Sequence, residues 1–272
     1  MSTPAPGRPM SLLDLKRKGN GLPSRVVMHG VEGIGKTSFA AFAPTPVFLQ
    51  TKGESGLETL IDSKQLPEID HFPELQTWGE LRAAVASIAK DEHDFKTLVI
   101  DTGNGAEQLC HEEVCRRDYA NDWGPKGFTS YMQGYSTALA DWREFLADLD
   151  ALRATRKMGI IVLCHTKVAT FKNPGGADYD RYEAKMHAKT WALTKEWADI
   201  VLFGDYDTDV SKQQPKDTKG KASDGKTRVL YTERTAVFDA KNRHGLPDEI
   251  DMGTSGKEAW TNFVTAMKEA RK

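Results

Sequence analysis

Residues 30–37 read Gly30-Val31-Glu32-Gly33-Ile34-Gly35-Lys36-Thr37. The run matches the phosphate-binding pattern G-x-x-x-x-G-K-[ST] at every fixed position. An apolar run at residues 25–29 predicts a strand before it, and residues 38–42 predict the first turns of a helix after it. In such a loop, successive backbone N–H groups converge on phosphate oxygens at the positive end of the helix dipole. The stretch therefore predicts a site for a nucleoside triphosphate.

The roles expected of individual residues follow from this loop, and the implied cofactors are ATP and Mg²⁺. Lys36 is expected to reach the β- and γ-phosphates, and the Thr37 hydroxyl to ligate Mg²⁺. A second acid usually positions the ion from the end of a neighbouring buried strand. Asp101 closes the apolar run at residues 97–101, so it is predicted as the other metal ligand. The expected nucleotide contacts are Gly30, Val31, Glu32, Gly33, Ile34, Gly35, Lys36, Thr37 and Ser38.

The composition is that of a globular chain without a dominant charge. Of 272 residues, 39% are hydrophobic and 28% charged, and the formal net charge is −2 at pH 7. A nucleic-acid partner must therefore be held by a local basic patch. The three cysteines are too few and too irregularly spaced for a disulfide framework or a zinc site. No apolar run approaches the roughly 18 residues of a membrane span, and residues 1–9 hold no apolar signal core. These features predict a cytoplasmic protein with no membrane partner.

Short apolar runs alternate with helical patterns along the chain. Strands are expected at residues 25–29, 47–50, 97–101, 158–164, 199–203, 228–232 and 236–240. Helices are expected near residues 38–42, 77–88, 106–117, 130–155, 188–197 and 257–271, and residues 51–76 look like a loop. Thr77 with Glu80 forms a capping-box pattern for the second of these helices. The alternation predicts an α/β fold with a mostly parallel sheet, helices on both faces and an antiparallel addition at one edge.

The expected organisation is a single large domain with short appendages. A flexible arm is expected at residues 1–22, an ATPase domain at residues 23–252 and a C-terminal helix at residues 253–272. No internal repeat or obvious linker interrupts residues 24–250.

Two further residues are candidates for nucleotide hydrolysis. A group must orient or deprotonate the attacking water, and Glu54, just after the second strand, is the candidate. An ordinary surface carboxylate is the alternative reading. His165 follows a buried strand at the edge where open α/β sheets bind ligands. It is predicted to hydrogen-bond the γ-phosphate and to report its presence to the chain that follows.

A basic run near the C-terminal end of the domain is the second distinctive feature. Lys241 and Arg243 alternate, so on a strand both side chains point the same way. Such a pair can clamp a triphosphate and stabilise charge that develops on the γ-phosphate. The alternative is a solvated basic edge strand.

Several of these features together resemble the core of RecA-like and AAA-type P-loop ATPases. More narrowly, the chain resembles phage-encoded ATP-binding proteins related to shortened RecA-like single-strand annealing recombinases, from about residue 12 to residue 249. The resemblance rests on residues 30–37, on Arg181-Tyr182-Glu183-Ala184-Lys185 leading to Glu196-Trp197-Ala198-Asp199, and on Tyr231-Thr232-Glu233-Arg234 leading to Phe238-Asp239-Ala240-Lys241-Asn242-Arg243.

The resemblance implies assembly into a ring or filament with ATP at subunit interfaces. Lys241 and Arg243 then act in trans on the ATP of a neighbouring subunit. The family's catalytic glutamate lies in a Thr-Glu-x-Gly run, whereas this chain reads Thr51-Lys52-Gly53-Glu54. This departure predicts slow hydrolysis. The resemblance implies that DNA stimulates hydrolysis, that the protein originates in a phage, and that it is located in the cytoplasm of the host bacterium.

Related proteins contact single-stranded DNA through loops on one side of the sheet. The stretch after His165 interleaves cations with aromatic residues, which suits phosphate contact and base stacking. The loops at residues 119–128 and 212–226 are weaker candidates. The predicted DNA contacts are Lys167, Lys172, Arg181 and Lys185.

The sequence thus predicts an ATPase that acts on single-stranded DNA in phage recombination or replication, by annealing or strand exchange. A phage single-strand-binding protein is a possible additional partner. Two alternatives stay open: a ring helicase-like motor, and a non-motor ATP-dependent assembly switch whose partner is a protein.

Overall fold

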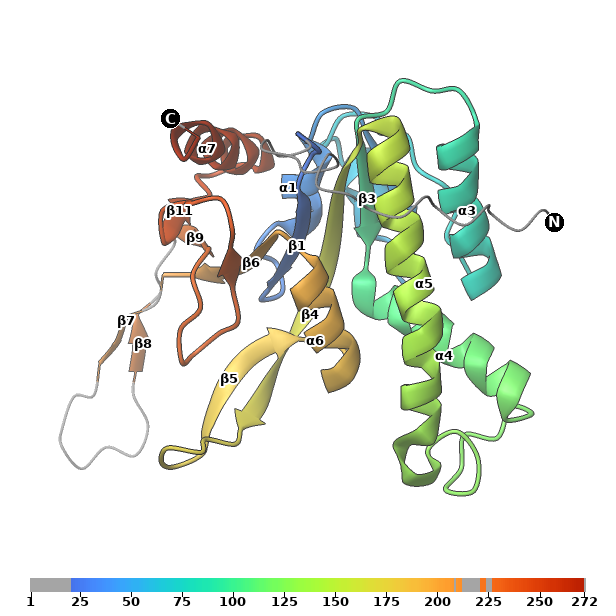
Figure 1. Ribbon diagram of the computed structural model, residues 1–272. Coiled ribbons are helices and arrows are strands. Elements are labelled where there is room, and N and C mark those ends of the chain that lie inside the picture. The colour runs from blue at the N-terminus through green and yellow to red at the C-terminus, as the bar shows by residue number, and fades with distance from the viewer. Residues whose placement is uncertain (1–20, 208, 212–220, 224–226, 272) are drawn as a thin grey trace, which may run out of the picture.

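The computed structural model describes residues 21–207, 209–211, 221–223 and 227–271. Nine strands of this part of the chain form one sheet, whose main path runs in the order β11-β9-β6-β1-β4-β3-β2 (Figure 1). The predicted arm at residues 1–22 and the loop at residues 212–226 lie largely outside the described residues.

The middle of the sheet consists of five parallel strands. They are β6 (Ile200–Tyr206), β1 (Arg25–Gly30), β4 (Gly159–Phe171), β3 (Thr97–Asp101) and β2 (Pro46–Gln50). Neighbours along this path pair in parallel. Their almost continuous apolar runs fit strands that are covered on both faces.

Antiparallel strands extend the sheet beyond β6 and pair with the second half of β4. Strand β9 (Arg228–Tyr231) pairs with β6, and β11 (Glu249–Asp251) pairs with β9. The two-residue β10 (Lys241–Asn242) pairs with the start of β6. Strand β5 (Tyr179–Ala184) forms a hairpin with the second half of β4, and β7 (Asp209–Ser211) pairs with β8 (Lys221–Ser223) as a separate ribbon. The predicted α/β class and antiparallel edge addition are confirmed.

Four helices cover one face of the sheet: α3 (Trp78–Lys90), α4 (Gly103–Asp118), α5 (Gln133–Arg156) and α6 (Ala188–Trp197). A short 3-10 turn, η2 (Ser130–Met132), precedes α5. Helix α3 begins with the predicted capping box, in which the Thr77 hydroxyl accepts from the Glu80 N–H at 3.1 Å. The apolar stripe of α5, including Trp142, Phe145 and Leu149, packs into the core on this face.

The other face carries α1 (Lys36–Ala41), α2 (Gly56–Asp62) and α7 (Gly256–Glu269). Phe39 of α1 packs against Trp260 and Phe263 of α7. Gly256 lies so close to α1 that an added Cβ would approach the Ser38 carbonyl oxygen to 2.4 Å. Helix α7 is therefore held against the helix that follows the phosphate-binding loop.

Three local expectations were wrong. Residues 51–76 contain helix α2, where only a loop was expected. Strand β4 continues six residues beyond His165 and returns as β5, where a loop was also expected. Residues 236–240 form no strand. Within residues 166–184, β-branched and aromatic residues flank a Gly-Gly turn, and that pattern is typical of a hairpin.

No helix in the described part of the chain is long and apolar enough to span a membrane.

Candidate nucleotide-binding site

The predicted site residues meet at one edge of the sheet, where the parallel strands end. In the β1–β4 pairing Gly30 lies opposite His165, and in the β3–β4 pairing Asp101 lies opposite Leu163. Gln50, at the end of β2, lies opposite Asp101. The carboxyl ends of parallel strands are where open α/β sheets bind ligands. The topology therefore brings together residues from widely separated parts of the chain.

Each glycine of the loop is required for a steric reason of its own. Gly30 lies against β6, where an added Cβ would come within 2.5 Å of the Gly204 carbonyl oxygen. Gly33 and Gly35 have φ values of +76° and +98°, a region that glycine adopts without strain. The loop leads directly into α1, so its backbone N–H groups gather at the start of that helix, as an anion site requires.

Lys36 lies across the loop. Its Nζ donates to the carbonyl oxygens of Gly30 at 3.0 Å and Val31 at 3.1 Å. Burial lowers the pKa of Lys36, against the opposing attraction of Asp101. A partly desolvated ammonium favours a nearby anion, which is the role expected of this lysine beside phosphates.

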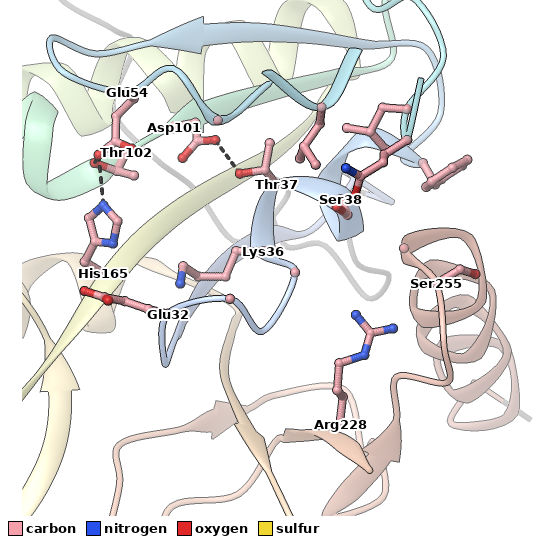
Figure 2. A pocket seen from close by; sticks show the side chains of 18 of the residues that line it. Glu32, Lys36, Thr37, Ser38, Glu54, Asp101, Thr102, His165, Arg228 and Ser255 are labelled. Atoms are coloured by element: carbon pink, nitrogen blue, oxygen red, sulfur yellow. Dashed lines mark hydrogen bonds and ion pairs between the residues drawn. The ribbon is translucent and has the colours of Figure 1, made fainter. Parts of the chain in front are cut away.

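Thr37 and Asp101 form the pair predicted to hold the metal. The Thr37 hydroxyl donates to Asp101 Oδ2 at 2.8 Å (Figure 2). Asp101 is 5% exposed, and burial raises its pKa to about 6 in spite of the hydrogen bond from Thr37. Hydroxyl and carboxylate oxygens are the ligands that Mg²⁺ prefers, and a divalent cation would favour the charged form of Asp101. The donor set fits the ion.

Glu54 and His165 form a second pair beside the first. His165 Nε2 lies 2.9 Å from Glu54 Oε1, and the Thr102 hydroxyl donates to the same oxygen at 3.1 Å (Figure 2). The hydrogen bond with His165 lowers the pKa of Glu54. Glu54 is thus oriented by two partners inside the site, unlike an ordinary surface carboxylate. Its catalytic role and the sensor role of His165 stay predictions.

One cavity of about 660 Å³ contains both pairs. The phosphate-binding loop, Glu54, Asp101 and His165 line one part of it. Another part is lined by residues that the sequence analysis did not single out: Phe42, Leu60, Gln65, Leu66, Arg228, Thr254 and Ser255. No short-range pattern links Arg228 to the loop, because the contact depends on the pairing of β9 with β6. The cavity has the size expected of a small-molecule site.

Lys241 and Arg243 lie near the amino ends of the parallel strands, whereas the nucleotide cavity lies at their carboxyl ends. Strand β10 pairs Lys241 with Val201, near the start of β6. Lys241 Nζ donates to the carbonyl oxygens of residues Lys195, Glu196 and Ala198 at the end of α6. Burial and the charge of Arg243 lower the pKa of Lys241 to about 8. Arg243 is more open, with a side chain 52% exposed. Neither residue reaches the nucleotide cavity of its own chain, so the predicted contact requires a neighbour.

The predicted DNA contacts occupy different environments along the β4–β5 hairpin. Lys167 Nζ donates to the Met186 carbonyl oxygen at 2.5 Å, whereas Lys185 is exposed. Lys172 is exposed and lies 2.6 Å from Asp178. Arg181 is the least suited of the four to contact DNA, because it is 6% exposed and forms ion pairs with Glu183 and Asp239. The residues next to Arg181 in the sequence do not predict this burial, because it depends on Asp239, which is 58 residues away.

The fold and the site define a P-loop protein of the α/β class. A family model described as an AAA domain matches residues 22–244, so the chain belongs to this family. The chain also resembles the crystal structure of the RadB recombinase, with a TM-score of 0.45, 14% identity, and coverage of 87% of this chain and 90% of that one. No curated protein matches the sequence.

Proposed function

We propose that the protein binds and hydrolyses ATP and couples the state of the nucleotide to single-stranded DNA. The observation that carries this proposal is the hydrogen bond between His165 and Glu54, at 2.9 Å. Glu54 faces the nucleotide cavity, and His165 lies in the strand that continues as the β4–β5 hairpin. A change at the γ-phosphate therefore has a short path to the hairpin, through this hydrogen bond and then along the backbone of β4.

The chemistry of the site supports ATP with Mg²⁺. Thr37 and Asp101 hold the ion, which neutralises phosphate charge when it is bound. Lys36 binds the terminal phosphates. Glu54, kept charged by its hydrogen bond with His165, accepts a proton from the attacking water or orients that water.

The surface of the hairpin supports a single-stranded partner. Lys172 and Lys185 are exposed, and Val168 is 60% exposed between them. Phe171 and Tyr179 lie side by side across the hairpin, with ring centroids 5.2 Å apart. Cations beside aromatic rings suit sequence-independent binding through phosphate contacts and stacking. The sequence resemblance further supports a role in phage recombination or replication, in the cytoplasm of a host bacterium.

A strand-binding experiment tests this proposal. We expect a fluorescently labelled oligothymidylate to bind with ATP present and to bind more weakly with ADP. The double variant Lys172→Ala/Lys185→Ala loses two cations, so its affinity falls about tenfold and the salt slope falls by about one to two. The matched control is Lys90→Ala, an exposed lysine at the end of α3, which leaves binding unchanged. Equal binding by the double variant, or no strand binding in any nucleotide state, contradicts the DNA assignment.

We further propose that ATP sits between subunits and that Arg243 reaches it in trans. The support is geometric: Arg243 is half exposed and lies at the edge of the sheet away from its own cavity. We expect Lys36→Ala and Arg243→Ala each to be nearly inactive alone. Mixed subunits recover ATPase activity, because some interfaces then combine an intact Lys36 with an intact Arg243. Absence of recovery at any mixing ratio excludes the trans role.

One observation favours a second candidate, a nucleotide-dependent switch that binds a protein. Three large apolar side chains gather where α4 leads to α5: Trp123 is 41% exposed, Tyr131 94% and Met132 49%. Apolar surface of this kind marks interaction sites. Failure of strand binding together with retained ATP binding supports this candidate, and unwinding of a duplex supports a ring motor.

A further inference from the structure

Arg228 enters the nucleotide cavity from the antiparallel edge of the sheet. It is the first residue of β9, and its Nε and Nη2 both donate to the Gly253 carbonyl oxygen, at 3.1 and 2.8 Å. One side of the guanidinium is therefore fixed to the turn before α7. The remaining nitrogen, Nη1, lies next to the phosphate-binding loop, 3.4 Å from the Ile34 carbonyl oxygen.

The fit between Arg228 and the loop is close. A Cβ added to Gly35 would lie 2.9 Å from Arg228 Nη1. The guanidinium thus fills the space that a side chain at position 35 would take. Gly35 is also the residue directly before α1, where backbone N–H groups collect for an anion. The cation and the start of the helix converge on the same part of the cavity.

Arg228 forms no ion pair with a carboxylate in the described part of the chain. The nearest acid to act on it is Glu258, whose pKa is lowered by hydrogen bonds from Thr254 and further by the charge of Arg228. Glu258, the acid at the start of α7, instead accepts from the N–H and hydroxyl of Thr254, at 2.6 and 2.9 Å. A fixed arginine that lines a cavity beside a phosphate-binding loop is suited to a bound phosphate, which matches its planar set of donors.

The position of Arg228 within the cavity indicates which phosphate of the nucleotide it contacts. Figure 2 shows Glu54 and His165 on one side of Lys36 and Thr37, and Arg228 and Ser255 on the other. Glu54 and His165 mark the end of the γ-phosphate, so Arg228 faces the end that carries the α-phosphate and the nucleoside. We propose that Arg228 binds the α-phosphate of the nucleotide held by its own chain. This inference rests on the proposed function and adds a binding residue at its base end.

Nucleotide affinities of matched variants test the inference. With fluorescent ATP and ADP analogues, we expect Arg228→Gln to weaken both by a similar factor, about tenfold, since a charge-assisted hydrogen bond to the shared phosphate is lost. Lys36→Ala should weaken ATP more than ADP, because it also acts on the γ-phosphate. The salt dependence of ADP binding should fall in Arg228→Gln.

A control separates a phosphate contact from a loosened turn. Glu258→Gln weakens the same turn before α7 and leaves the cation in place, and the negative charge that it removes opposes an anion beside Arg228. We expect it to bind ADP within twofold of the wild type. An equal loss in Glu258→Gln and Arg228→Gln assigns the effect to the turn and overturns the inference, as does ADP affinity unchanged in Arg228→Gln. A loss confined to ATP also overturns it. Failure of the wild type to bind either nucleotide instead overturns the proposed function.

Discussion

Glu54 is the residue at which the chain departs from the pattern of similar ATPases, and the structure gives it a defined environment. It lies in the nucleotide cavity, holds hydrogen bonds to Thr102 and His165, and has a lowered pKa. A carboxylate with a low pKa is a weak base. The geometry therefore suits Glu54 to orient water, and its weak basicity predicts slow hydrolysis.

We expect Glu54→Gln to bind ATP almost as well as the wild type but to hydrolyse it about a hundredfold more slowly, because the amide has one acceptor oxygen in place of two with which to orient the water and cannot accept its proton. Steady-state phosphate release and equilibrium nucleotide binding measure the two effects.

The control for this variant is Glu92→Gln, an exposed carboxylate after α3. It should leave both quantities unchanged. Turnover within threefold of the wild type in Glu54→Gln would exclude Glu54 from the chemical step.

Among the individual site residues, the sequence could predict those that belong to local motifs. Residues 30–37 and Asp101 carry their signal in a few neighbouring positions, and the structure brings them together. Arg228 and the burial of Arg181 depend on contacts across the fold, so no pattern near either residue announced them. Lys241 was read from the alternation of charges, which does not reveal that α6 carbonyl oxygens engage it.

A buried acid, Asp239, links the hairpin of β4 and β5 to helix α6 and to the residue before the phosphate-binding loop. Asp239 Oδ2 accepts from Arg181 of β5 at 3.0 Å and from Trp191 and Lys195 of α6 at 2.9 and 2.7 Å. Burial opposes ionisation of Asp239, but hydrogen bonds from Lys195 and Trp191 outweigh it and lower the pKa. The Asp239 carbonyl oxygen also bonds to His29, the residue before the phosphate-binding loop, at 2.7 Å.

Asp239→Ala should destabilise the protein by about 3 to 5 kcal/mol, because buried Arg181 keeps only Glu183 as a carboxylate partner and the Trp191 N–H and Lys195 lose their acceptor. Equilibrium unfolding in urea measures the change. The matched control is Asp180→Ala on the same hairpin, where the exposed Asp180 accepts a hydrogen bond from Thr170. We expect a cost below about 0.5 kcal/mol there. Equal costs for the two variants would contradict the structural role of Asp239.

The elements themselves were predicted unevenly, for a physical reason. Long apolar runs and helical stripes fixed the five parallel strands and helices α3 to α7, because these segments carry several turns or a complete buried strand. Helix α2 has only seven residues, of which Leu57 alone is buried, so its periodic signal is weak. The second half of β4 is partly exposed and polar, and without a buried face it looked like a loop.

Across the whole molecule, the residues with proposed functions lie at the two ends of the parallel strands. The nucleotide cavity lies at the carboxyl ends of the parallel strands, and the β4–β5 hairpin extends beyond that edge (Figure 1). Arg243 lies at the amino ends. An arginine that serves a neighbour's site from a different surface implies a heterologous, head-to-tail contact, which generates rings or filaments. This arrangement gives a reason to expect assembly that neither edge gives alone.

We propose that nucleotide turnover and single-stranded DNA are coupled through one site. The most direct test is the rate of ATP hydrolysis by the wild type with and without a long single-stranded DNA, with Lys36→Ala as the inactive reference. We predict slow hydrolysis that rises at least several-fold with single-stranded DNA, and no activity above background in Lys36→Ala. A rate that is the same with and without DNA, in a wild type that binds ATP, would contradict the account.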